Sequence, residues 1–259
     1  TAVAASELTA ESKPATQYTI DANQEVYALL DFEDTTEFEN ATKGLLASPD
    51  TLDICDENGK VVWSQTAYAF LDQDAPDTAN PSLWRNTQLN HIYGLFEVTD
   101  GIYQVRGYDM SNVTFIKGDT GWIVVDPLMS VECAQAAFAL VEENLGTFPV
   151  KAVIYSHSHV DHFGGVKGIV SEEEVQAGNV QVIAPEGFEK YAVSENIYAG
   201  TAMGRRASYQ YGTMLEGGET GSLAIGIGMG QSKGRTSYIS PTLEITQTGE
   251  KHTIDGVEI

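Results

Sequence analysis

Residues 155–165, YSHSHVDHFGG, decide how this chain is interpreted, because they hold three of its five histidines. His157, His159 and His162 lie within a span of six residues, and Asp161 stands between the last two. Imidazole nitrogens and carboxylate oxygens suit zinc and metals of similar softness. This density of ligating groups favours a shared metal centre, with one ion or two, over a histidine-rich surface loop.

The residues before the motif predict how its side chains are presented. Residues 150–156, VKAVIYS, are apolar and β-branched, so they predict a buried strand that ends just before His157. Residues two apart in an extended segment share a face, so His157 and His159 could bind one ion together. Asp161 and His162 are adjacent and would diverge, so they would more easily serve a second ion about 3.5–4 Å away.

The word HSHVDH followed by FGG resembles the H-x-H-x-D-H signature of the metallo-β-lactamase superfamily. Longer stretches are similar to one branch of it, the alkylsulfatases that degrade linear alkyl sulfates: NPSLWRNTQLN at 80–90, GLFEVTDGIYQVRGYDMSNVTFIKGDTGWIVVDPL at 94–128, VIAPEGF at 182–188, VSENIYAG at 193–200 and RRASYQYG at 205–212. The likeness runs from about Phe32 to Ile259. It implies an α/β fold, an αββα sandwich with a two-metal site at one edge of its sheets.

The resemblance also implies an activity, that of a zinc-dependent alkylsulfatase. Two zinc ions held partly by His157, His159, Asp161 and His162 would lower the pKa of a bridging water to about 7, and the water would cleave an alkyl sulfate such as dodecyl sulfate to alcohol and inorganic sulfate. Asp161 and His162 are the residues expected to take part in catalysis, Asp161 as a ligand and not as a base. The alternatives are another hydrolase of this fold, acting on a β-lactam, thioester, lactone or phosphodiester, or a non-catalytic metal-binding fragment.

Asp126 ends the apolar run WIVVD and has two interpretations. An aspartate in this place can cap a turn or a helix, but the matching aspartate of the superfamily supports the metal-binding loop. Ligating histidines usually need a hydrogen-bond partner, so we expect Asp126 to support the ligands. An amphipathic helix predicted over 130–144 connects this strand to the strand at 150–156. The two strands are therefore predicted to be parallel neighbours that carry Asp126 and His157 to the same edge of the sheet.

Arg205 and Arg206 are notable because the chain has only 14 basic residues against 37 acidic ones, a net charge of −23. A substrate carrying a sulfate would be repelled by this field unless local cations reversed it near the site. Both arginines therefore have two interpretations, as substrate-binding residues or as partners of acidic residues on the surface or at a subunit contact. Tyr209 and Tyr211 are weaker candidates for substrate contacts. The same negative charge argues against nucleic acid and anionic membranes as partners.

Two regions are predicted along the chain: an N-terminal arm and extension over residues 1–94, and the first half of a metallo-β-lactamase-like catalytic domain over residues 95–259. The extension should contain a hairpin that turns at Asn58-Gly59 and a helix capped by Asn80. Its first thirty residues are small and polar, and they predict a poorly ordered or surface-lying arm.

In the catalytic region, strands and helices are predicted to alternate. Residues 171–174 form a capping-box pattern, and residues 185–211 predict a mostly helical stretch. The run GIGMGQSKG at 226–234 lacks the residues of a phosphate-binding loop and predicts a flexible loop beside the site. Residues 243–259 predict two short strands around Gly249-Glu250.

Cys55 and Cys133 have neither C-x-x-C nor zinc-ribbon spacing, and the alanine-rich surroundings of Cys133 predict a buried thiol. His91 is expected to be a packing or surface residue and His252 a structural one, and neither is expected to bind a metal. No apolar run reaches about 18 residues, so no membrane span is predicted. The cysteines leave the compartment open, and only the resemblance favours a periplasmic or secreted protein.

The resemblance implies parts that this sequence does not contain. The family's further metal ligands, the second half of its sandwich, a helical dimerisation domain and a sterol-carrier-like domain all follow the strand that ends here at Ile259. The sequence is therefore expected to be an amino-terminal portion that packs against further polypeptide, with a homodimer formed through regions outside it. Without that cover, the apolar strands containing Ile154 and Val182 would face solvent.

Overall fold

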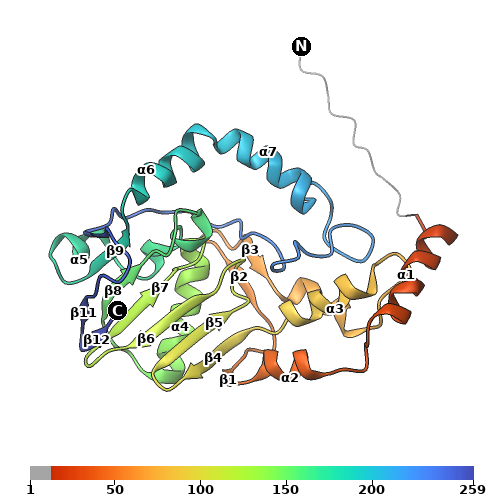
Figure 1. Ribbon diagram of the computed structural model, residues 1–259, viewed down its shortest axis with the longest axis horizontal. Coiled ribbons are helices and arrows are strands. Elements are labelled where there is room, and N and C mark those ends of the chain that lie inside the picture. Colours follow the sequence, from red (N-terminus) through yellow and green to blue (C-terminus); the bar gives the residue numbers. More distant parts are fainter. Residues whose placement is uncertain (1–12) are drawn as a thin grey trace, which may run out of the picture.

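The computed structural model describes residues 13–259, and a single mixed sheet of eight strands forms its centre (Figure 1). The strand order is β1-β4-β5-β6-β7-β8-β9-β10. Strands β4 to β7 form an antiparallel meander, and β7 to β10 run parallel to one another. The eight strands are β1 (Leu45–Ala47), β4 (Gly94–Thr99), β5 (Ile102–Arg106), β6 (Val113–Lys117), β7 (Trp122–Val125), β8 (Val150–Ile154), β9 (Gln181–Pro185) and β10 (Leu243–Ile245). The predicted α/β class is confirmed.

Helix α4 (Val131–Leu145) makes the crossover between β7 and β8, as the sequence predicts. Gly146 ends this helix with a φ of 93°, a conformation that glycine adopts at little cost. The helix buries its apolar stripe against one face of the sheet, where its side chains join the main hydrophobic core: Val131, Cys133, Ala134, Ala137 and Val141. The two parallel strands therefore end at the same edge of the sheet.

The opposite face of the sheet carries a smaller apolar cluster of Ile123, Ala152, Ile183 and Ile254. Ile254 comes from a hairpin of β11 (Thr253–Ile254) and β12 (Val257–Glu258) that packs on this face. The expectation that the strand at Val182 faces solvent is wrong, because Val182 is fully buried in the core on the α4 side and Ile183 is only 5% exposed.

Ile154 packs against the smaller cluster and is partly buried. The expectation that the Ile154 side chain faces solvent is therefore wrong as well.

The end of the chain turns at a different place from the one predicted. The tight turn lies at Asp255-Gly256, between β11 and β12, while residues 243–245 join the central sheet as β10. An Asp-Gly pair is a strong hairpin signal because both positions favour positive φ, here 46° and 83°. The Asp255 carboxylate also accepts hydrogen bonds from the backbone N–H groups of Thr120 and Gly121, each at 2.8 Å.

The N-terminal extension contains the expected hairpin, β2 (Asp53–Cys55) with β3 (Val61–Ser64), and the expected helix α3 (Pro81–Asn90). The Asn80 side chain caps α3 by accepting from the backbone N–H groups of Ser82 and Leu83. The other elements there are α1 (Gln17–Leu29), α2 (Thr36–Thr42) and the 3₁₀ helix η1 (Thr66–Asp72).

The predicted arm over the first thirty residues lies partly outside the described residues, since residues 1–12 are not described. Its described part is surface-lying as expected, because α1 buries no side chain. Of the two alternatives predicted for the arm, the surface-lying one holds for α1, which is helical and has the Thr16 side chain as its N-cap.

After the histidine motif the chain forms short helices and then a long arm. The 3₁₀ turns η2 (Val160–His162) and η3 (Val166–Gly168) precede α5 (Glu172–Gln176), whose predicted capping box is present. Helix α6 (Phe188–Val193), a π-helical turn η4 (Ser194–Tyr198) and α7 (Gly200–Tyr211) then run along one side of the molecule, at the top of Figure 1. We refer to residues 188–211 as the α6–α7 arm.

Three side chains outside the motif carry a prediction of burial or of a structural role, and the predicted burial of the Cys133 thiol is confirmed. Cys133 is buried and Cys55 is exposed, and both are free thiols. His91 contacts the Gln65 amide oxygen at 2.8 Å, and His252 pairs with a glutamate on its own segment at 2.9 Å. Within the described residues, no helix has the length and apolarity needed to cross a membrane.

Candidate metal centre

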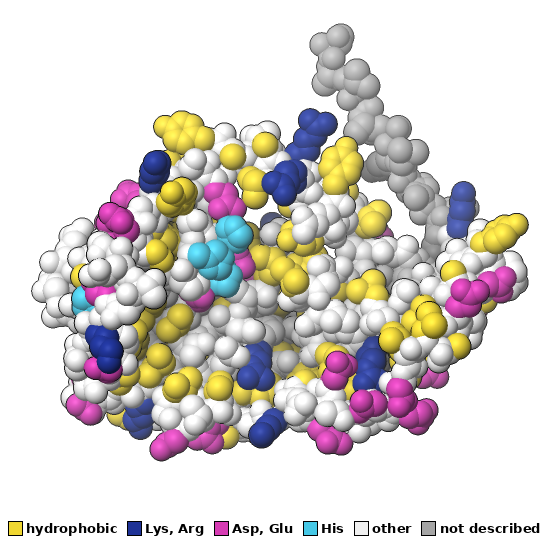
Figure 2. All heavy atoms as spheres, viewed as in Figure 1, with side chains coloured by type: hydrophobic (Ala, Val, Ile, Leu, Met, Phe, Trp, Pro, Cys, Tyr) yellow, Lys and Arg dark blue, Asp and Glu magenta, His cyan; other side chains and the backbone are white. Residues whose placement is uncertain are grey.

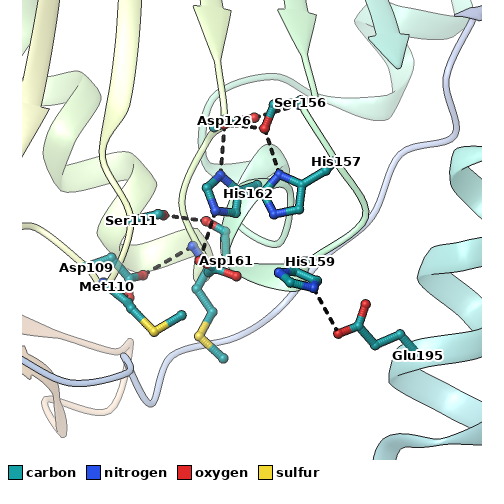
Figure 3. Close-up of polar contacts among 11 residues, drawn as sticks. Asp109, Met110, Ser111, Asp126, Ser156, His157, His159, Asp161, His162 and Glu195 are labelled. Atoms are coloured by element: carbon teal, nitrogen blue, oxygen red, sulfur yellow. Dashed lines mark hydrogen bonds and ion pairs between the residues drawn. The ribbon is translucent and has the colours of Figure 1, made fainter. Parts of the chain in front are cut away.

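The carboxyl ends of β7 and β8 bring Asp126 next to the histidine motif (Figure 3). Asp126 has a φ of 55°, a conformation uncommon outside glycine that aspartate tolerates better than most residues. Its backbone N–H still bonds to the Ile154 carbonyl oxygen at 2.9 Å, which keeps the two strand ends together. The turn after β7 therefore directs this carboxylate toward the residues that follow β8.

The Asp126 carboxylate accepts three short hydrogen bonds. The Ser156 backbone N–H donates to one oxygen at 2.8 Å, and the Ser156 hydroxyl and His162 Nδ1 contact the other at 2.6 and 2.8 Å. The contact with His162 is the one that the predicted supporting role of Asp126 requires, and the role itself stays a prediction. Since Ser156 has a single hydroxyl proton and gives it to Asp126, its oxygen accepts from His157 Nδ1, which lies 2.9 Å away.

These contacts fix which nitrogen of each histidine can bind a metal. His157 and His162 both use Nδ1 for hydrogen bonding, so the lone pair of Nε2 is left for a ligand in each neutral ring. His159 differs, because its Nε2 faces a carboxylate oxygen of Glu195 at 3.4 Å and its Nδ1 is left. Metal-ligating histidines commonly have their outer nitrogen held in this way.

The four motif residues lie close together. The ring centres of His157 and His159 are 4.7 Å apart, and those of His157 and His162 are 4.1 Å apart. His162 Nε2 lies 3.1 Å from an Asp161 carboxylate oxygen. Within the described residues, no group of three His, Cys, Asp or Glu side chains has the arrangement of a finished metal site. The residues fit zinc because they offer imidazole and carboxylate donors, and because one nitrogen of each ring already has a polar contact that orients it. Zinc bound at His162 Nε2 would replace the present contact of this nitrogen with Asp161.

The pKa values follow from these contacts. Burial disfavours the charged form of His162, but the hydrogen bonds with Asp126 and Asp161 outweigh it and raise the pKa of His162 to about 9. Burial acts against the charged form of Asp161 too, yet the hydrogen bond and charge of His162 keep the pKa of Asp161 below its usual value. Burial and the two neighbouring imidazoles lower the pKa of His157, which favours the neutral, ligating ring.

A pocket with a volume of about 490 Å³ opens between the motif and the α6–α7 arm. Asp161 and His159 line it from below, and Arg206 and Tyr211 line it from α7. The histidine side chains are visible on this face in Figure 2, below basic side chains of the arm. The glycine-rich loop also reaches the pocket, through residues 227 and 231, which is the flanking position predicted for it.

The structure distinguishes the two arginines, because Arg206 lines the pocket and Arg205 does not. Neither arginine forms an ion pair with the described residues, so the alternative of surface ion pairs finds no support there. The two tyrosines separate in the same way: Tyr211 lines the pocket, whereas Tyr209 is 83% exposed.

Sequence reasoning missed several residues that hold the centre in place. Ser111 donates a hydrogen bond from its hydroxyl to the backbone carbonyl oxygen of Asp161. Asp109 is 3% exposed and accepts from the backbone N–H groups of Met110 and Met129 and from the hydroxyl of Ser232. The one signal for Asp109 was its position just after a strand, in the word GYDMSN, where a polar residue can fix a loop.

Comparisons with known proteins agree with this geometry. Residues 106–238 match the family model described as the metallo-beta-lactamase superfamily. Over 248 residues the chain is 50% identical to a linear primary-alkylsulfatase of Pseudomonas sp, a match that covers 95% of this chain and 37% of that protein. An alkyl/aryl-sulfatase of Saccharomyces cerevisiae is 48% identical over 241 residues, which cover 93% of this chain and 37% of the yeast protein.

A solved structure shows the same fold over almost the whole chain. The stereoselective inverting sec-alkylsulfatase Pisa1 from Pseudomonas sp. matches with a TM-score of 0.91 at 48% identity, over 96% of this chain and 39% of that chain. The chain therefore spans less than two fifths of the length of these relatives. With a family match that covers residues 106–238, more than half of the sequence, this chain belongs to the metallo-β-lactamase superfamily.

Proposed function

We propose that this chain carries the histidine-motif side of the active site of an alkylsulfatase, a metal-dependent hydrolase that releases inorganic sulfate from alkyl sulfate esters. The observation that carries the proposal is the identity of 48–50% to alkylsulfatases over 93–96% of the chain. The histidine motif alone would permit any hydrolase of the superfamily. The extended likeness is what favours sulfate esters over a β-lactam, thioester, lactone or phosphodiester.

His157, His159, Asp161 and His162 would hold the metal, which we propose to be two zinc ions completed by further ligands. Zinc bound there would act as a Lewis acid and lower the pKa of a bound water. Asp126 and Ser156 contact Nδ1 of His162 and His157, so Nε2 is the nitrogen of each ring that could bind a metal. In His162 this nitrogen would exchange its contact with Asp161 for the metal. The Ser111 hydroxyl holds the backbone of Asp161, so its carboxylate is presented from a fixed loop.

The pocket supplies what an alkyl sulfate would need besides the metal. Arg206 offers a planar guanidinium that can donate two parallel hydrogen bonds to the oxygens of a sulfate group. Met110, Met203 and Ile227 line the same pocket and present apolar surface to an alkyl chain. A local cation matters here because the net charge of the chain, −23, repels an anionic substrate.

Sulfate release tests this proposal directly. The purified protein should release inorganic sulfate from dodecyl sulfate, and His159→Ala should abolish the release. Hydrolysis of a chromogenic β-lactam, a thioester or a phosphodiester without sulfate release would establish one of the other superfamily activities. Tight zinc binding with no hydrolysis of any of these esters would support a metal-binding fragment.

A matched pair of variants tests the substrate pocket. Arg206→Ala should raise KM for dodecyl sulfate by about tenfold, which corresponds to the lower end of the roughly 1.5–3 kcal/mol that a hydrogen bond to a charged group contributes, because Arg206 is exposed. Arg205→Ala removes the same charge from the adjacent, preceding position of α7 and should leave KM nearly unchanged. Equal effects of the two substitutions would mean that only the overall charge of α7 matters. A periplasmic location and a homodimer also stay predictions that the resemblance supplies.

A further inference from the structure

Glu195 adds a second carboxylate to the pocket that already contains Asp161. Its side chain is only 25% exposed, and it lines the pocket together with Asp161. The proposed substrate is an anion, and a second carboxylate close to Asp161 makes that pocket less favourable for it. Within the described residues, the only basic nitrogen within 4.0 Å of this carboxylate is Nε2 of His159, at 3.4 Å.

The local backbone explains how Glu195 reaches this position. Residues 194–198 form a π-helical turn, closed by a hydrogen bond of 2.9 Å from the Ala199 N–H to the Ser194 carbonyl oxygen. Such turns are rare inside helical segments and occur often at functional sites. Here the turn divides its side chains, since Ile197 and Tyr198 are 72% and 85% exposed whereas Glu195 lines the pocket (Figure 3).

His159 differs from the other two motif histidines in the nitrogen that has a polar partner: it is Nε2 in His159 and Nδ1 in His157 and His162. Ser156 and Asp126 contact Nδ1 of His157 and His162, and both supports come from the strand ends below the motif. No contact of this kind from the strand ends reaches the His159 ring, which is 59% exposed, in the described structure. An exposed imidazole without a partner would sample several orientations and both tautomers, and fixing it would cost part of the metal-binding free energy.

We propose that Glu195 is a positioning residue for His159: it accepts the Nε2 proton, fixes the ring orientation, and so leaves Nδ1 as the metal-binding nitrogen. The α6–α7 arm thereby supports the one motif histidine that the sheet edge does not support. This inference rests on the metal centre of the proposed function. It adds to that function a residue from an element outside the histidine motif.

Zinc affinity, measured by competition with a chelator, tests the inference without using enzyme turnover. Glu195→Ala should weaken zinc binding by about 10–100-fold, the usual effect of losing a hydrogen-bond partner of a ligating histidine. Glu195→Gln should stay within about threefold of the native affinity, because its amide oxygen can still accept the Nε2 proton. Glu189→Ala removes an exposed carboxylate from the same arm and serves as the matched control, with unchanged affinity.

A second readout reports the tautomer itself. In nitrogen NMR spectra of the zinc-loaded native protein, His159 should carry its proton on Nε2 and show metal coordination at Nδ1, with slow exchange of the Nε2 proton. The slow exchange should be lost in Glu195→Ala and kept in Glu195→Gln. Coordination through Nε2 would overturn the proposal, as would a Glu195→Ala variant that binds zinc as tightly as the native protein or a Glu195→Gln variant as weak as Glu195→Ala.

The failure of the proposed function would look different from these results. A native protein that binds no zinc would overturn the metal centre and this inference with it. A native protein that binds zinc with an affinity that does not depend on residue 195 would overturn the role of Glu195 alone.

Discussion

Replacing Asp126 by alanine should both destabilise the protein and weaken its metal binding. The carboxylate accepts three hydrogen bonds of 2.6–2.8 Å, and hydrogen bonds to charged groups contribute roughly 1.5–3 kcal/mol each. Their simple sum, about 4.5–9 kcal/mol, is an upper limit, because the contacts share one group and water can reach the exposed Ser156. We expect a loss of about 3 kcal/mol in the free energy of unfolding.

Metal binding should suffer separately, since His162 loses the partner that fixes its ring. A loss of 10–100-fold in zinc affinity is expected, which corresponds to about 1.4–2.8 kcal/mol. Asp126→Asn should lie between the native protein and Asp126→Ala, because asparagine tolerates the φ of 55° and keeps one acceptor oxygen.

Urea denaturation of the metal-free protein and chelator competition with zinc measure the two effects independently. Asp100→Ala is a suitable control, because Asp100 is exposed in the turn between β4 and β5 and far from the motif in the sheet order. If Asp126→Ala unfolds at the native urea concentration and binds zinc like the native protein, the supporting role assigned to Asp126 is wrong.

Three further predictions concern packing, thiols and a buried charge. Gly165→Ala should cost at least about 3 kcal/mol of stability, because its new methyl group would overlap the backbone of the loop after β7. Gly204 faces open space on α7, so Gly204→Ala should stabilise the protein by about 1 kcal/mol. Equal urea midpoints of the two variants would contradict this prediction. One thiol per native chain, Cys55, should react with a thiol reagent, and Cys133 only after denaturation, since burial raises the pKa of the Cys133 thiol; two fast thiols would refute the burial. Burial raises the pKa of Asp109, so the contribution of Asp109 to stability is complete below its unfolded pKa and is lost as the pH rises through its folded pKa. When unfolding is measured from pH 4 to 8, Asp109→Asn should therefore gain stability relative to the native protein as the pH rises. A difference in stability that does not change with pH would disprove this prediction.

Much of the fold could be predicted because local signals and tertiary contacts agree. The strand, helix and strand over residues 122–154 are each marked by periodicity, and the handedness of such crossovers leaves one arrangement. The turn at 255–256 was missed although Asp-Gly is a good hairpin pair, because Gly249-Glu250 offered a competing signal. The choice between them depends on the contact of Asp255 with Thr120, which lies far away in the sequence.

The candidate site could be predicted only in part. The motif residues carry their own signal, and the Asp126 contacts follow from parallel strands that end at one edge. Glu195 gave no signal, because its position depends on a π-helical turn that no residue pattern marks. Arg205 and Arg206 looked alike in the sequence, and only the orientation of α7 distinguishes them.

The Asp109 contacts have a consequence for the order in which the molecule assembles. The hydrogen bond from Ser232 to Asp109 joins residues 123 positions apart, whereas the bond from His162 to Asp126 joins residues only 36 apart. Contacts between residues near in sequence form with less loss of chain entropy, so they tend to form earlier in folding. We therefore expect the strand–helix–strand unit with its motif to form in the folding transition state, and the glycine-rich loop to dock afterwards. Substitutions at Ala137 in α4 should then slow folding, while substitutions at Ser232 should mainly accelerate unfolding.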